Sequence, residues 1–204
     1  AGVLTHRASP DRPGTFALTI DPPVASGDLE VVARELIFVV DTSGSMMGSP
    51  IERVRAVMKH AVTSLGPNDI FNIIDFSSSA AKMAERPLTN TPQNVERALA
   101  FITELRSAGG TDMLAGIRAA LDATPDPARM RVVCFMTDGY IGNDEEVLRE
   151  IRHRIGQSRL FSFGVGADIN DFLLTQMSKV GRGATQTVHI GEFAEPVDQV
   201  VGRF

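Results

Sequence analysis

The fold is decided by the stretch Arg34-Glu-Leu-Ile-Phe-Val-Val-Asp-Thr-Ser-Gly-Ser-Met46. From Leu36 to Val40 it is a short apolar run of branched and aromatic side chains, which is typical of a strand buried on both faces of a parallel sheet. The run stops at Asp41, and Ser43 and Ser45 follow at every second position, with a glycine between them that lets the backbone curl. We therefore expect three oxygen-bearing side chains to face one point at the end of a central strand.

These side chains have the chemistry that a hard divalent cation prefers, because Mg²⁺ takes oxygen ligands at about 2.0–2.1 Å and keeps positions for water or a partner. Two more oxygen donors occur in distant loops, Thr111 in Gly109-Gly-Thr-Asp112 and Asp138 in Met136-Thr-Asp-Gly139. Each piece alone also fits an ordinary turn, since Asp, Ser and Gly are common loop residues. Their combination favours a metal site.

The Asp-x-Ser-x-Ser run, with the distant threonine and aspartate, resembles the metal-ion-dependent adhesion site of von Willebrand factor type A domains. The resemblance implies that Mg²⁺, or Mn²⁺ or Ca²⁺ in its place, is bound by five side chains, namely Asp41, Ser43, Ser45, Thr111 and Asp138. The segments Phe71 to Phe76 and Thr137 to Asn143 are similar to the subgroup found in inter-alpha-trypsin inhibitor heavy chains and their bacterial relatives. In that subgroup the domain follows a separate β-rich domain.

Strand and helix patterns alternate from residue 34 onward, which predicts an α/β domain over residues 34–204. The expected fold is a doubly wound, mostly parallel sheet of six strands with helices on both faces and one short antiparallel edge strand within Ala81 to Leu88. The expected last strand is Ala184 to Ile190, and the expected last helix is Glu192 to Val201. Residues 1–33 are rich in proline and contain one alternating run, Thr15 to Ile20, so they are interpreted as a connector from a preceding domain.

This topology explains how distant residues can meet, because ligands of open parallel sheets gather beyond the carboxyl ends of strands. Two carboxylates, Asp41 and Asp138, balance the charge of a bound divalent cation without over-neutralising it, so the cation stays electrophilic and can accept another oxygen ligand. In the family that ligand is typically a Glu or Asp of a protein partner. The resemblance therefore implies a metal-dependent protein-binding module and not an enzyme, with secreted or cell-surface relatives.

Three alternatives stay open. The domain could pack in cis on a β-rich neighbour, with its metal held by the parent chain, or the last helix could move as a conformational switch. A metal-dependent hydrolase is disfavoured because the four histidines, His6, His60, His153 and His189, show no paired ligand spacing.

Several neighbours of the expected site have two possible roles. Met46, Met47 and Met113 could form an adaptable rim or pack inward. Asp112 could orient a metal-bound water or start a helix. Ser77 to Ser79 follow a strand end and would lie on the face of the site, although a solvated loop is the preferred interpretation. Tyr140, the single tyrosine, could line the groove or cover the core.

Composition excludes other classes of function. The chain of 204 residues has a net charge of −5 and scattered basic residues, so no nucleic-acid surface is expected. No apolar run approaches the length of a membrane span, and a polar start at Ala1 predicts no signal peptide, as expected for a piece of a longer protein. Cys134 is the single cysteine and is predicted to be a core residue. The isolated domain is expected to be a monomer.

Overall fold

The computed structural model describes residues 2–20, 32–139, 141–166, 168–188 and 196–197. The chain divides into two compact units, Ala1–Val31 and Val32–Phe204. The predicted last helix falls almost wholly outside the described residues, and so do Tyr140 and His189.

The first unit is a β-hairpin of β1 (Gly2–His6) and β2 (Thr15–Thr19), which pair antiparallel. The alternating run near Thr15 is thus a strand, as predicted. Its partner β1 was not predicted, because its sequence, Gly-Val-Leu-Thr-His, places two apolar residues side by side and begins with glycine. Both strands are exposed along their whole length.

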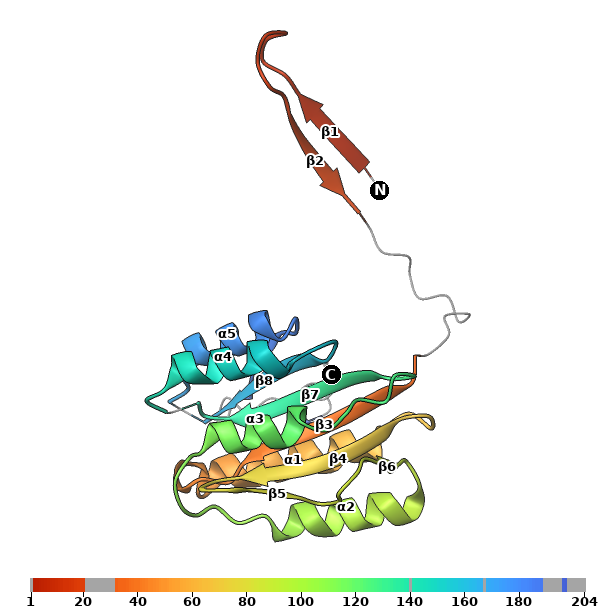
Figure 1. Cartoon of the computed structure of the whole chain (residues 1–204), viewed down its shortest axis with the longest axis vertical. Coiled ribbons are helices and arrows are strands. Elements are labelled where there is room, and N and C mark those ends of the chain that lie inside the picture. Colours follow the sequence, from red (N-terminus) through yellow and green to blue (C-terminus); the bar gives the residue numbers. More distant parts are fainter. Residues whose placement is uncertain (1, 21–31, 140, 167, 189–195, 198–204) are drawn as a thin grey trace. The chain divides into compact units, whose positions relative to one another are not determined.

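The second unit is built on one sheet with the strand order β5-β4-β3-β7-β8-β9 (Figure 1). Its central strand β3 pairs in parallel with both β4 and β7. The parallel strands are β3 (Arg34–Asp41), β4 (Ile70–Phe76), β7 (Met130–Thr137), β8 (Arg159–Val165) and β9 (Thr185–Val188). The predicted doubly wound, mostly parallel α/β fold is confirmed.

The antiparallel edge consists of two short strands where one was expected, so the described sheet has seven strands. Strands β5 (Ala80–Lys82) and β6 (Leu88–Thr89) both pair with β4. Between them the side-chain amide of Asn72 bonds both backbone groups of Ala84, its Nδ2 lying 2.7 Å from the carbonyl oxygen. A side chain therefore replaces the backbone ladder at this point and divides the edge strand.

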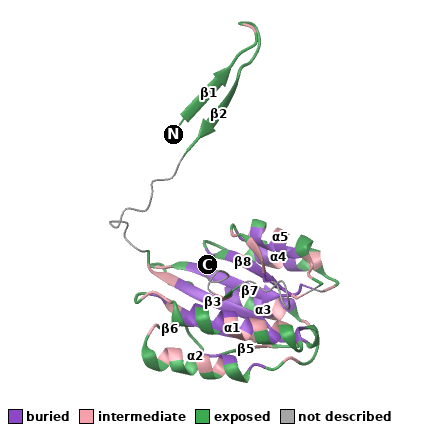
Figure 2. Ribbon diagram, turned by 180° about the vertical axis from the view of Figure 1, so that it is seen from behind, coloured by how far each residue is buried: buried purple, intermediate pink, exposed green. Residues whose placement is uncertain are grey.

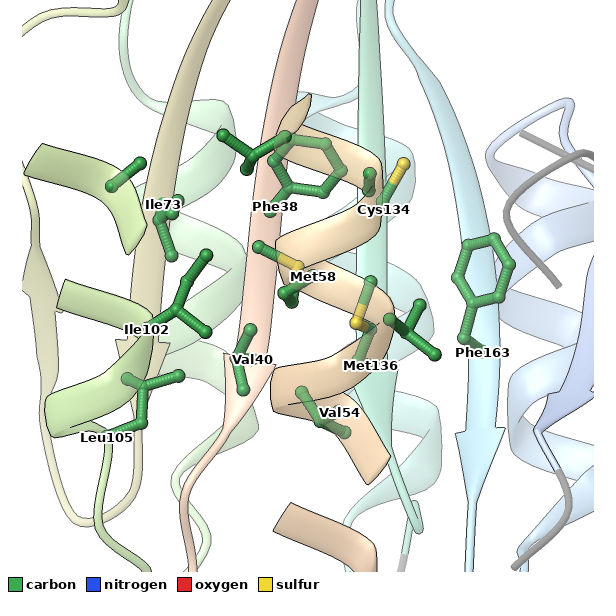
Figure 3. Packing of buried hydrophobic residues seen from close by; sticks show 14 of the residues in the cluster. Phe38, Val40, Val54, Met58, Ile73, Ile102, Leu105, Cys134, Met136 and Phe163 are labelled. Carbon is green, nitrogen blue, oxygen red and sulfur yellow. The ribbon is translucent and has the colours of Figure 1, made fainter. Parts of the chain in front are cut away.

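Helices cover both faces of the sheet, because β3 places alternate side chains in two different cores. On one face Phe38 and Val40 pack with helices α1 (Ser49–Thr63) and α2 (Pro92–Glu104), as Figure 3 shows. On the other face Ile37 and Val39 pack with helices α3 (Met113–Leu121), α4 (Asp144–Arg154) and α5 (Asp171–Val180). The strands between these layers are buried along most of their length (Figure 2).

Cys134 lies in the first core beside Phe38 (Figure 3). It is fully buried, and burial raises the pKa of its thiol to about 12. It is therefore a core residue, as predicted. Among the described residues, no helix has the length and apolar character needed to cross a membrane.

Helix α3 lies unusually close to β4, because a Cβ added at Gly116 would come within 2.9 Å of the ring of Phe76. A Gly116→Ala variant should therefore lose about 1–3 kcal/mol of unfolding free energy from overpacking, more than the roughly 1 kcal/mol that alanine gains in a helix. Chemical denaturation measures the difference. The double variant G116A/F76L should recover part of the loss, and a G116A domain as stable as the parent would contradict this packing.

Candidate metal centre

Asp41 ends strand β3 and is fully buried. Each of its carboxylate oxygens accepts a hydrogen bond. The backbone N–H of Ser43 donates to Oδ1 at 2.8 Å, and the hydroxyl of Thr137 donates to Oδ2 at 2.5 Å. These bonds fix the carboxylate at the carboxyl end of the sheet.

The chain then forms a single 3-10 turn, Gly44–Met46, with Ser43 as its first flanking residue. This turn places the two serine hydroxyls side by side, with Ser43 Oγ 3.1 Å from Ser45 Oγ. Met46 is fully buried and anchors the turn in the core, whereas Met47 is 68% exposed. Met46 therefore packs inward, which is one of the two roles expected for these methionines. Met47 is exposed, as the other role, a rim of the site, requires.

The loop that carries Thr111 is tied to this turn by backbone hydrogen bonds. The N–H of Gly44 donates to the carbonyl of Gly109 at 3.1 Å, and the N–H of Ala108 donates to the carbonyl of Thr42 at 2.8 Å. Gly109 has a φ of +82°, a conformation that glycine adopts without strain. The half-buried Thr111 follows two residues later. The structure thus bonds the loop that carries the predicted threonine to the serine turn.

The serines after β4 hold the same loop from the other side. Ser78 Oγ accepts from the N–H of Gly110 at 2.9 Å, and the carbonyl of Ser77 accepts from the N–H of Asp112 at 2.6 Å. Asp112 in turn caps helix α3 by accepting from the N–H of Ala115. The helix-start role of Asp112 therefore holds. The serines lie on the face that their place after a strand end predicts, but their interpretation as a solvated loop missed their role in positioning the Thr111 loop.

Asp138 directly follows strand β7 and is 7% exposed. Its carbonyl accepts from the N–H of Asn170 at 2.9 Å, which ties it to the start of α5. The residue before it, Thr137, accepts from the N–H of Gly139 while donating to Asp41. Sequence reasoning missed Thr137, because a threonine at a strand end is ordinary until its carboxylate partner is known.

The two aspartates lie close enough to interact electrostatically. Burial is the main cause that raises the pKa of Asp41, hydrogen bonds from Ser43 and Thr137 oppose it, and repulsion from Asp138 adds to it. Among the described residues, no arginine or lysine forms an ion pair with Asp41. Since the folded state holds the proton more tightly than the unfolded chain, the metal-free domain loses stability as the pH rises from the ordinary carboxyl pKa through the raised one.

These observations fit a hard cation. The groups gathered here are carboxylates and hydroxyls, which are the oxygen donors that hard divalent cations prefer over softer metals. A buried carboxylate without a cationic partner is costly, and a bound cation removes that cost. The donor set therefore suits Mg²⁺, Mn²⁺ or Ca²⁺.

The remaining neighbours lie away from this arrangement. Met113 is 2% exposed and packs in the second core, so it forms no rim. His60 and His153 are exposed in the last turns of α1 and α4, and neither makes a described contact with the serine turn.

Replacing Thr137 with valine should raise the pKa of Asp41 further, because the carboxylate loses a hydroxyl donor. The variant should also lose about 1–3 kcal/mol of stability, since the N–H of Gly139 is left without its acceptor. Carbon-13 NMR titration of the metal-free domain measures the pKa. Thr137→Ser keeps the hydroxyl and serves as the control. An unchanged Asp41 pKa in T137V would show that this hydrogen bond does not stabilise the carboxylate.

Comparison with known proteins identifies the family. The family model described as the von Willebrand factor type A domain matches residues 34–187, and the chain therefore belongs to that family. A von Willebrand factor A domain-containing protein of Dictyostelium discoideum is 31% identical over 175 residues, which is 85% of this chain. Inter alpha-trypsin inhibitor, heavy chain 4, of Mus musculus is 28% identical over 178 residues, or 81% of this chain. The resemblance seen in the sequence is confirmed. The match spans 19% of each of these relatives.

Solved structures show the same fold at low sequence identity. A von Willebrand factor type A protein from Catenulispora acidiphila has a TM-score of 0.69 at 20% identity, covering 76% of this chain and 38% of its own. Manganese-loaded Plasmodium vivax TRAP protein has a TM-score of 0.63 at 20% identity, and the match covers 84% of this chain and 71% of the TRAP chain. Proximal thread matrix protein 1 from the mussel byssus, with a zinc occupied MIDAS motif, has a TM-score of 0.62 at 20% identity. The match covers 83% of this chain and 44% of the mussel chain.

Proposed function

We propose that this domain is a metal-ion-dependent protein-binding module. Its divalent cation would be held by side chains from three separate segments of the chain, namely Asp41, Ser43, Ser45, Thr111 and Asp138. The partner would be a protein that presents a glutamate or aspartate to the cation. We take Mg²⁺ as the resident ion, with Mn²⁺ as the closest substitute in ligand type.

The observation that carries the proposal is the buried carboxylate of Asp41, which has hydrogen-bond donors on both oxygens and no described cationic partner. A divalent cation held by two carboxylates and neutral hydroxyls keeps enough positive charge to attract a further carboxylate. Ser45 belongs to an exposed stretch, so this edge is open to a second protein.

The solved relatives support the metal. Their descriptions record manganese in the Plasmodium vivax protein and zinc at the MIDAS motif of the mussel byssus protein. We extend divalent-metal binding to this chain on the basis of its own oxygen donors. A secreted or cell-surface location, and a domain over 34–204 that follows a connector over 1–33, remain proposals that rest on the resemblance to inter-alpha-trypsin inhibitor heavy chains.

A second candidate is packing in cis on an adjacent β-rich domain. The observation in its favour is the hairpin, which carries exposed apolar side chains such as Leu4 at 77% and Phe16 at 74%. Two-stranded hairpins are marginally stable alone, so such strands commonly belong to a larger sheet. We propose no catalytic role, because His60 and His153, the described histidines of the second unit, lie in the last turns of α1 and α4 and offer no base beside the aspartates.

Metal binding should stabilise the parent domain and not an Asp41→Asn variant. At a concentration of Mg²⁺ about 100 times the dissociation constant, linkage adds about 2.7 kcal/mol, which raises the melting temperature by about 5–10 °C. In EDTA the D41N domain should melt at the same temperature as the parent or higher, since a buried charge has been removed. Differential scanning calorimetry in EDTA and in Mg²⁺ measures both effects.

The matched control is Asp75→Asn. Asp75 is half-buried near the end of β4, and burial raises its pKa, yet it lies outside the proposed ligand set. The D75N domain should therefore keep the full response to Mg²⁺. Equal stabilisation of the parent and D41N by Mg²⁺ would overturn the proposed metal centre.

A further inference from the structure

A pocket of about 440 Å³ opens at the start of helix α1. One wall is formed by residues between Met47 and Arg55, and the other by Thr103, in the last turn of helix α2, with Arg106 and Ser107, which follow that helix. The pocket therefore lies between two helices that cover the same face of the sheet.

This pocket is next to the proposed metal centre. Met47 lies two residues after Ser45, and Ser107 precedes Ala108, whose N–H is bonded to Thr42 at 2.8 Å. Figure 3 shows Val54 of α1 and Leu105 at the end of α2 near the level of Val40, close to the carboxyl end of β3. The pocket and the serine turn thus share one edge of the sheet.

Hydrogen bonds hold two guanidinium groups at the pocket. Arg55 donates from one terminal nitrogen to the carbonyl of Leu105, and Arg106 donates to the carbonyls of Thr103 and Leu105, both at 2.9 Å. No salt bridge within the described residues involves either arginine. Both guanidinium groups keep donors that are not used in these bonds.

Two buried polar atoms among the residues lining the pocket lack a partner within the described chain. They are Nε of Arg55 and Oγ of Ser107. A buried donor without an acceptor costs free energy, so a side-chain shift that brings either atom to an acceptor of a ligand would recover that cost. Both atoms can donate, which favours a ligand that offers oxygen acceptors.

Charge selects the kind of acceptor. The pocket is lined by Arg55 and Arg106 against one acid, Glu52, and is therefore net positive before any metal binds nearby. A carboxylate matches a guanidinium fork and forms stronger hydrogen bonds than a neutral carbonyl. Met47 at the rim is 68% exposed and gives an adaptable apolar edge for the stem of an acidic side chain.

We propose that this pocket is a second carboxylate subsite for the protein partner. It would take one acidic side chain of a partner segment while another acid of the same segment reaches the metal, so the inference rests on the proposed function. The partner is then an acidic segment with two carboxylates at a fixed spacing, and its specificity comes from that spacing.

Synthetic peptides test the spacing. One peptide carries a single glutamate among glycines and alanines, and a series adds a second glutamate at each of the next four positions. Calorimetric titration in Mn²⁺ should give one spacing that binds about tenfold more tightly than the single-acid peptide. On binding, the Arg55 Nε–H resonance in a nitrogen-15 NMR spectrum should shift with that peptide only.

Substitution at the pocket supplies the second readout. Arg106→Gln should reduce the ratio of two-acid to single-acid affinity toward one, and Ser107→Ala should lower it in the same direction. Arg152→Gln removes an exposed arginine of α4 and should leave the ratio within about twofold of the parent value. These ratios cancel any general loss of folding, because both peptides are measured on each variant.

The outcomes separate this inference from the proposed function. Metal-dependent binding of the single-acid peptide, with no advantage for any two-acid spacing, overturns the second subsite and leaves the metal-bridged function standing. The subsite is also overturned if R106Q leaves the ratio of two-acid to single-acid affinity unchanged, or if R152Q lowers that ratio as much as R106Q does. General charge attraction would then explain the tighter binding of the two-acid peptide. Absence of binding by every peptide in Mn²⁺ overturns both.

Discussion

The site depends on the burial of Asp41 between two parallel strands. Its carboxylate ends β3 and receives a hydroxyl hydrogen bond from Thr137 at the end of β7, 2.5 Å away. Burial and the nearby Asp138 both act against ionisation, and the two hydrogen-bond donors only partly offset them. The fold therefore holds an aspartate in a setting where a cation stabilises its charged form, and the neighbouring loops are arranged around that point.

Those loops are linked to one another by hydrogen bonds. Gly109 bonds to the serine turn at Gly44, and the serines after β4 bond the backbone on either side of Thr111. Helix α3 continues from this loop and rests against Phe76 with no room for a side chain at Gly116. The threonine is thus positioned by backbone hydrogen bonds and close packing, which is a stronger constraint than a flexible loop would give.

Much of this arrangement could be predicted from the sequence. Apolar strands, helical periodicity and the Asp-x-Ser-x-Ser spacing predict the α/β fold and the convergence of Asp41 with Ser43 and Ser45. The place of the serines after a strand end predicts the face on which they lie, but their hydrogen bonds to the Thr111 loop could not be predicted. The contacts of Thr137 could not be predicted either, since they depend on which strands are neighbours. The division of the edge strand at Ala84 could not be predicted either. The side-chain amide of Asn72, 12 residues earlier in the sequence, takes the place of the backbone hydrogen bonds there.

If the serine turn and the two aspartates form one cation site, crystals of the domain soaked in Mn²⁺ should show the ion there. Diffraction recorded near the manganese absorption edge should give an anomalous peak within about 2.0–2.3 Å of oxygen atoms of Asp41, Ser43 and Ser45, as hard cations require. A peak at another place on the domain, or no peak at saturating Mn²⁺, would show that these side chains do not form a cation site.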